Sequence, residues 1–362
     1  MSVIASLGTA SPRHKHQQSD ILAFMLKLHN GDAPTSTKLK AIYRNCDIES
    51  RYSVLSDYSS EHNTFFPERG SIEPFPGVDQ RMRAFHTHAV ELSAEAIEQC
   101  MTASRYLLKD ITHLITVSCT GLSAPGLDIE LMKKLGLMKN IHRSSVNFMG
   151  CYAAIHALKQ ADSICMSNPD AVVLVVCTEL CTLHFQKFKE DDHLLANSLF
   201  ADGAAAALVV PNARKGIKME GFYSEVELSG AEDMAWSVSE TGFLMRLSSY
   251  IPKIIKANID GYFHRAISHF KVHKDDVRYW ALHPGGKRIL EVVAEQLSLE
   301  DHQSKPAANV LRDYGNMSSA SILFVLKELV QHHYKKETPG KIFGLAFGPG
   351  LTMESMILSV KD

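Results

Sequence analysis

Three side chains beside glycines have the types and positions that acyl-transfer chemistry needs. Cys151 follows Gly150 in "FMGCYAA", His283 ends a predicted strand in "ALHPGG", and Asn316 follows Gly315 in "DYGNMSSAS". A cysteine at a helix start lies near unpaired backbone N–H groups, which favour the thiolate and lower its pKa. A histidine and an amide supply hydrogen-bond donors for a developing oxyanion. We therefore predict that Cys151 is a nucleophile and that His283 and Asn316 are its electrophilic partners.

Each of the three residues also has an ordinary structural interpretation. A free cysteine is commonly a small buried hydrophobe, a histidine at a strand end can be a satisfied core residue, and asparagine is a good helix N-cap. Two chemistries use the trio in this order along the chain. Papain-like proteases carry a C-G-S-C-W-type signature that is missing here. Claisen condensation on thioesters is the other.

The elements that position these residues alternate between strands and helices, which indicates an α/β layered fold. Near-continuous apolar runs are typical of strands that are covered on both faces. We predict strands at residues 2–10, 113–118, 144–149, 171–179, 203–211, 277–283, 341–348 and 353–360. We predict helices at residues 18–29, 36–46, 79–102, 128–136, 251–270, 287–298 and 306–314, and directly after Cys151 and Asn316. Residues 53–80 are polar and are predicted to form a surface loop.

Composition excludes several classes of function. The formal net charge is -2, so there is no basic field for nucleic acid or an anionic membrane. No apolar run reaches the length of a membrane span, and the N-terminus lacks the basic start of a secretory signal. Seven scattered cysteines in such a chain indicate reduced thiols and a cytoplasmic protein. Cys177, Cys181 and His184 have metal-like spacing, but no second pair completes four ligands, so no metal site is expected.

Five motifs in order resemble those of type III polyketide synthases, the chalcone and stilbene synthase-like enzymes of the thiolase superfamily. They are "GCYAA", "LFADGAAAALVV", "ALHPGGKRILE", "DYGNMSSASILFVL" and "AFGPGLTMES". The resemblance extends from the first predicted strand to the last. It implies an α/β thiolase-like fold, five-layered αβαβα, made of two related halves at residues 1–213 and 214–362. It also implies a homodimer.

The resemblance further implies a reaction. Cys151 would accept the starter acyl group from an acyl-CoA, and its thiolate would pair with His283. His283 and Asn316 would hold the thioester oxygen of malonyl-CoA while CO2 leaves. Cyclisation would give a pyrone, a resorcinol or a phloroglucinol ring. CoA thioesters are substrates in this scheme, and no separate cofactor is implied.

The remaining site residues are carried over from the same resemblance. Phe200 matches an aromatic gate, and Met245 stands where plant members have a second gate phenylalanine. Cys119 replaces a plant threonine, a change typical of bacterial members. The residues expected to line the substrate cavity are Phe200, Met245, Cys119, Ala124, Gly348, Pro349 and Gly350. The residues expected to bind CoA are Arg44 and Lys40, with Arg51 as an alternative. Two alternatives stay open: a ketoacyl synthase III-like enzyme that uses a carrier protein, and a non-catalytic acyl-CoA-binding protein of thiolase fold.

Overall fold

A large mixed sheet runs through the computed structural model, which describes residues 2–29, 32–67 and 75–361. Within that part of the chain, nine strands are hydrogen-bonded side by side. In sheet order they are β11 (Val277–Leu282), β12 (Lys341–Gly348), β13 (Thr352–Lys361), β8 (Gly216–Val226), β1 (Ser2–Ala10), β7 (Asp202–Pro211), β6 (Val173–Leu180), β4 (His113–Ser118) and β5 (His142–Asn147). Most strands read as continuous apolar runs because both faces of the sheet are covered.

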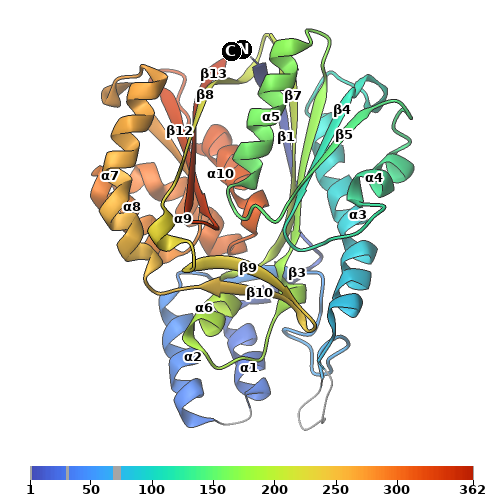
Figure 1. Cartoon of the computed structure of the whole chain (residues 1–362), viewed down its shortest axis with the longest axis vertical. Coiled ribbons are helices and arrows are strands. Elements are labelled where there is room, and N and C mark those ends of the chain that lie inside the picture. Colours follow the sequence, from blue (N-terminus) through green and yellow to red (C-terminus); the bar gives the residue numbers. More distant parts are fainter. Residues whose placement is uncertain (1, 30–31, 68–74, 362) are drawn as a thin grey trace.

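The helices cover the sheet in layers. They are α1 (Gln18–Leu28), α2 (Ala33–Asn45), α3 (Val78–Thr102), α4 (Leu127–Leu135), α5 (Ala153–Ser167), α6 (Asp191–Leu199), α7 (Ile251–Phe270), α8 (Lys287–Leu297), α9 (Asp301–Tyr314) and α10 (Ser321–Glu328). Figure 1 shows α3 and α4 on one outer side and α7, α8 and α9 on the other. Helices α5 and α10 lie between the two parts of the sheet and contact strands of both. The order is therefore αβαβα.

The two halves repeat one topology. In the first half β4 is parallel to β6, β6 is antiparallel to β7, and β7 is antiparallel to β1. In the second half β11 is likewise parallel to β12, β12 is antiparallel to β13, and β13 is antiparallel to β8. Helix α5 precedes β6 as α10 precedes β12. The halves join where β1 pairs with β8, and the proposed boundary at residues 213 and 214 lies in the turn between β7 and β8.

Smaller elements close one end of the molecule. The hairpin of β9 (Met234–Ser239) and β10 (Gly242–Leu247) lies against α6, and α6 packs on α2. Figure 1 shows this hairpin crossing below the central helices, above α1, α2 and α6. A second small sheet pairs β2 (His14–Gln17) with β3 (Ser50–Ser53). Within the described residues, no helix is both long and apolar enough to cross a membrane.

Most predicted elements are confirmed, and two differences have physical causes. Helix α9 begins at Asp301, not at Pro306, because the Gln303 side chain accepts the Glu300 backbone N–H and starts the helix a turn earlier. The predicted loop at 53–80 ends where α3 begins at Val78, and its residues 68–74 lie outside the described residues.

Candidate active site

Cys151 lies in a tight turn between β5 and α5. Gly150 has φ +81°, and a Cβ there would lie 2.2 Å from Cδ of Pro349. A side chain at position 150 is therefore excluded by both the left-handed backbone and the neighbouring loop. Cys151 precedes the first residue of α5, Ala153, by two positions. The predicted helix start is thus correct to within one turn.

The environment of the Cys151 thiol differs from the sequence-based prediction. The side chain is buried, and Sγ lies 3.6 Å from Oγ of Ser318. Burial raises the pKa of Cys151 to about 12, which hydrogen bonds from Ser318 and Asn316 only partly oppose. The prediction of a lowered pKa is wrong because the cost of burying a thiolate exceeds the stabilisation that the helix start provides.

His283 lies at the end of β11 with its imidazole inside the protein. Its backbone N–H donates to the carbonyl of Leu345 at 2.8 Å, and its carbonyl accepts from Gly285 N–H at 2.9 Å. Both ring nitrogens are buried and have no hydrogen-bond partner among the described residues. Burial lowers the pKa of His283 to about 3, so the ring is neutral at physiological pH. An unpartnered buried imidazole is rare and is available to a ligand.

Asn316 is fixed by its backbone and by one end of its amide. Its N–H donates to Leu199 and its carbonyl accepts from Ala201, both at 2.9 Å, so it forms a parallel bridge with Phe200. Oδ1 accepts from Ser318 N–H at 2.9 Å, and Nδ2 donates to the carbonyl of Gly285 at 3.3 Å. The Asn316 side chain also forms a hydrogen bond with Cys151 that lowers the pKa of the thiol, so the cap-like contact is compatible with an amide donor that faces Cys151.

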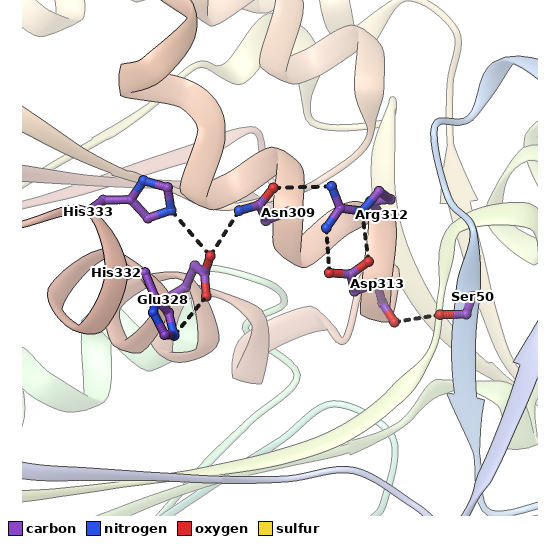
Figure 2. Close-up of polar contacts among 7 residues, drawn as sticks. All are labelled: Ser50, Asn309, Arg312, Asp313, Glu328, His332 and His333. Atoms are coloured by element: carbon purple, nitrogen blue, oxygen red, sulfur yellow. Dashed lines mark hydrogen bonds and ion pairs between the residues drawn. The ribbon is translucent and has the colours of Figure 1, made fainter.

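The helix that leads into Asn316 is anchored on both sides, as Figure 2 shows. Nδ2 of Asn309 on α9 donates to Glu328 on α10 at 2.9 Å. Oγ of Ser50 on β3 donates to the carbonyl of Asp313 at 2.9 Å. His333 also contacts Glu328, at 3.2 Å. These contacts fix the last turn of α9, and with it the direction in which Asn316 enters the site.

Cys151, His283 and Asn316 line one cavity of about 590 Å³. Of the residues predicted to bind substrate, Phe200, Met245, Cys119 and Pro349 line it as well. Its other lining residues are Thr120, Gly150, Cys181, Met234, Trp236, Leu247, Gly285, Ile289, Ser318 and Phe347. A nucleophile and two donor groups therefore share a largely apolar chamber.

Both halves of the chain match one family. The model for the N-terminal domain of chalcone and stilbene synthases matches residues 1–212, and the model for their C-terminal domain matches residues 226–361. The chain belongs to the chalcone and stilbene synthase family. It is a type III polyketide synthase, a condensing enzyme that transfers acyl groups.

Relatives of this polyketide synthase agree along its whole length. The alpha-pyrone synthesis polyketide synthase-like protein Pks18 of Mycobacterium tuberculosis is 29% identical over 367 residues, which cover 99% of this chain and 91% of Pks18. The crystal structure of PKS-I from the brown alga Ectocarpus siliculosus has a TM-score of 0.92 at 29% identity and covers 99% of this chain and 98% of its own. The type III domain of Steely1 from Dictyostelium has a TM-score of 0.91 at 28% identity, with 100% and 99% covered. The thiolase-like fold is thus confirmed, and a bacterial origin stays a prediction.

Three residues predicted to bind substrate in this polyketide synthase lie outside the cavity. Gly348 faces the ring of Tyr152, which a Cβ would approach to 2.5 Å, so it allows close packing behind Cys151. Gly350 has φ +112° and turns the chain after Pro349. Ala124 lies in an exposed loop after β4. The first two shape the wall indirectly, and Ala124 does not line the cavity of its own chain.

Cys119 holds the nucleophile turn in addition to lining the cavity. Its Sγ accepts from Gly150 N–H at 3.0 Å, and its carbonyl accepts from Nε1 of Trp236 at 2.6 Å. Trp236 lies on β9 of the hairpin and contributes a large indole to the cavity wall. Neither interaction was predicted from the sequence, since the partners are separated by 31 and 117 residues.

Glu179 is a buried carboxylate close to the site that sequence reasoning missed. It accepts from Oγ of Ser319 at 2.5 Å, from Oγ1 of Thr120 at 2.8 Å and from Cys119 N–H at 2.9 Å. Burial raises the pKa of Glu179, which these hydrogen bonds partly oppose. The network ties the loop after β4 to the turn before α10. The sequence shows a glutamate inside the apolar run of β6, which is unusual, but it does not indicate which residues that glutamate contacts.

The predicted CoA contacts divide into exposed and buried residues. Lys40 and Arg44 are exposed on α2 and make no ion pair within the described part of the chain. Arg51 is buried, and it donates to the carbonyls of Phe200 at 2.6 Å and Asn197 at 2.9 Å. Arg51 therefore positions the backbone of the gate residue, and its proposed role toward CoA is wrong.

Cys177, Cys181 and His184, which have metal-like spacing in the sequence, are all buried in the core. His184 uses both ring nitrogens, one with the carbonyl of Thr120 at 2.8 Å and one accepting from Phe243 N–H at 3.1 Å. Burial lowers the pKa of His184 to about 3. Across residues 2–29, 32–67 and 75–361, no group of three potential ligands could hold a metal ion.

Proposed function

We propose that this polyketide synthase extends an acyl-CoA starter with malonyl-CoA units, using Cys151, His283 and Asn316. Cys151 carries the acyl chain. His283 and Asn316 donate hydrogen bonds to the thioester carbonyl oxygen of malonyl-CoA. CoA thioesters are the substrates, and the scheme invokes no separate cofactor.

The state of His283 is the observation that carries this proposal. Its ring nitrogens are buried in the same cavity as the Cys151 thiol and have no protein partner. Leaving such a group unpaired costs free energy, about 1–3 kcal/mol for a buried polar group. A substrate oxygen that accepts from His283, and from the Asn316 N–H that otherwise faces Cys151, removes that cost. The oxygen that gains negative charge in the transition state accepts most strongly.

The steps balance as follows. The Cys151 thiol gives its proton to His283 and attacks the starter thioester, and CoA leaves as the thiol after taking that proton. The bond between the malonyl α-carbon and its carboxylate then breaks, CO2 leaves, and the electron pair enters the enolate held by His283 and Asn316. The enolate attacks the acyl carbonyl on Cys151. The C–S bond breaks, the thiolate is released, and a β-ketoacyl-CoA two carbons longer remains.

Ring closure follows extension in the same cavity. Trp236 and Met245, which are paired across the β9–β10 hairpin, form part of its wall. The relative Pks18 is named for alpha-pyrone synthesis. On that likeness we propose a pyrone as the product, with resorcinol and phloroglucinol rings as the alternatives that need longer chains.

A second cavity of about 660 Å³ adjoins the first and supports entry of a CoA thioester. The two cavities share Leu247, Gly285 and Ile289 in their linings. The lining of the second cavity combines apolar side chains with the polar residues Asn45, Ser248, Ser249, Lys287 and Arg288. We propose that the pantetheine arm lies here and presents its thioester to Cys151.

We also propose a cytoplasmic homodimer. All seven cysteines are buried and free of disulfides, which fits a reducing compartment. Strand β5 is an edge strand with mostly exposed residues, and the exposed residues Leu122 and Met138 lie in the segments that follow β4 and precede β5. A second copy that covered this edge would remove an exposed strand edge from water.

Product analysis tests the function. Purified protein is incubated with malonyl-CoA and short, long and aromatic acyl-CoAs, and products are identified by mass spectrometry. We expect extended, cyclised products from one starter class, and none from the Cys151→Ala variant.

Two results would contradict the proposal. Acyl transfer to Cys151 without extension would indicate a synthase that depends on a carrier protein, which a malonylated carrier protein would then rescue. Binding of acyl-CoA with no transfer would indicate a non-catalytic member of the family. Full condensing activity in Cys151→Ala would refute the assignment of the nucleophile.

A further inference from the structure

Two basic side chains from the C-terminal half of the chain lie at the outer end of the second cavity. Lys287 and Arg288 begin α8 and line the cavity, and both side chains are partly exposed. The opposite wall comes from α2, through Ile42, Asn45 and Cys46. The inner end of the cavity reaches Gly285, whose carbonyl accepts a hydrogen bond from Nδ2 of Asn316. The cavity therefore runs from a cationic mouth to the catalytic amide.

Lys287 forms an ion pair across this mouth. Its Nζ lies 2.9 Å from the carboxylate of Asp47, which directly follows the C-cap of α2. Arg288 is paired within its own helix, with Glu291 at 3.0 Å. The Lys287–Asp47 contact thus links the two helices that flank the cavity at its outer end.

Such a contact is easily replaced. An exposed lysine–carboxylate pair contributes little stability because water and salt screen it. A phosphate group carries more charge and more acceptor oxygens than Asp47, and arginine and lysine bind phosphates well. A phosphorylated ligand that threads its arm into the cavity would meet both cations at the point where the arm leaves the protein.

We infer that Lys287 and Arg288 bind the phosphate groups of the CoA thioester, and that Asp47 occupies Lys287 until the substrate displaces it. This inference rests on the proposed function, because it takes CoA as the carrier of the acyl group. It assigns phosphate recognition chiefly to α8. Lys40 and Arg44 on α2 do not line the cavity and contribute only a general attraction.

The test compares substrates with and without the phosphates. Steady-state kinetics are measured for the wild type, Lys287→Ala and Arg288→Ala with the acyl-CoA and with the corresponding acyl-pantetheine thioester. Loss of one charged hydrogen bond should raise KM for the CoA thioester on the order of tenfold. KM for the pantetheine thioester should stay within about twofold, since that substrate carries no phosphate.

Asp47→Asn tests the competition. Without the carboxylate, Lys287 is free before the substrate arrives, so KM for the CoA thioester should fall roughly two- to fivefold. The matched control is Lys256→Ala. Lys256 has a similar exposed pair, with Glu295 at 2.8 Å, but does not line the cavity. This control should leave both KM values unchanged.

The outcomes separate the inference from the function. Equal changes in KM for both thioesters would mean that the α8 residues act structurally, which would overturn the inference. Unchanged KM for the CoA thioester in both variants would place the phosphates elsewhere. If the wild type turns over no thioester, the proposed function fails. Calorimetric titration with CoA and with pantetheine then still tests the inference, because Lys287→Ala should weaken binding of CoA alone.

Discussion

Burial moves the pKa values of Cys151 and His283 in opposite directions, toward about 12 and about 3. Each group taken alone is therefore neutral, a resting thiol beside a resting imidazole. A thiolate forms only if its proton moves to a base in the same cavity, because the resulting opposite charges stabilise each other in a medium of low dielectric. His283 lines the same cavity, so we propose that its imidazole accepts this proton and titrates together with the Cys151 thiol.

Removal of the imidazole should make Cys151 less reactive at neutral pH. In His283→Ala the thiol keeps its burial and loses the proton acceptor, so its apparent pKa should rise relative to the wild type. Since only the thiolate is alkylated, the rate should then increase with pH up to the alkaline limit of the assay. The measurement is the pH dependence of iodoacetamide labelling at Cys151 by peptide mass spectrometry, with Cys151→Ala as the background. Coincident pH profiles for His283→Ala and the wild type would show that the two groups are not coupled.

The Asn316 amide has two ends with different tasks, and one substitution separates them. Asn316→Asp keeps an acceptor for Ser318 N–H but removes the Nδ2 donor. We expect decarboxylation of malonyl-CoA to fall roughly 100- to 1,000-fold, as for other oxyanion donors. Acyl loading on Cys151 should persist. Release of CO2 and acylation of Cys151 are measured separately, and equal losses in both would point to a distorted site instead of a missing donor.

At the scale of elements, the turn between β5 and α5 depends on the absence of a side chain at position 150. Gly150→Ala should destabilise the protein by about 1–2 kcal/mol through its positive φ, and by about 1–3 kcal/mol more through contact with Pro349. Gly136 offers a matched control, since its φ is +63° and a Cβ there meets nothing within 4 Å. Gly136→Ala should show the first cost only. Urea unfolding of both variants tests this, and equal losses would mean that the Pro349 loop moves freely.

The elements with regular patterns were predictable, and those that depend on distant partners were not. Helix α7 and strand β12 match their predicted ranges because each has a clear apolar pattern and clear ends. No strand was predicted for β9 and β10, whose exposed serines and threonine resemble a loop. Their strand conformation depends on pairing with each other and on packing against α6.

In the site, too, features marked by a local sequence pattern were predictable, and contacts between distant residues were not. The grouping of Cys151, His283 and Asn316 around one cavity was predictable, since glycine-flanked turns mark all three in the sequence, and their catalytic roles stay a prediction. The network of Glu179 was not, because its partners Ser319 and Thr120 come from two other elements. Lys287 looked like an ordinary helix residue. Its relation to Asp47 spans 240 residues and exists only in the folded chain.

At the scale of the whole molecule, the repeated topology explains how one site draws on both halves. Cys151 precedes α5 in the first half, and Asn316 occupies the corresponding place before α10 in the second. Because α5 and α10 are adjacent central helices, their N-terminal turns converge on one cavity. The hydrogen bonds of Asn316 with Leu199 and Ala201, which flank Phe200, then join the two halves beside the cavity. Neither half alone contains the nucleophile together with its donors.

The edge of the sheet leads to a prediction about assembly. Strand β5 pairs with β4 on one side only, and Leu122, after β4, and Met138, before β5, are 52% and 51% exposed. If a second copy covers this edge, Leu122→Asp and Met138→Asp each place a charge in the interface and should weaken the dimer by about 2 kcal/mol or more. Analytical ultracentrifugation should give about twice 40.2 kDa for the wild type and a shift toward 40.2 kDa for both variants. Leu228→Asp is the control, because Leu228 is 76% exposed and lies beyond β8, away from this edge. A wild-type monomer at micromolar concentration, or a dimer that only Leu228→Asp disrupts, would refute the proposed interface.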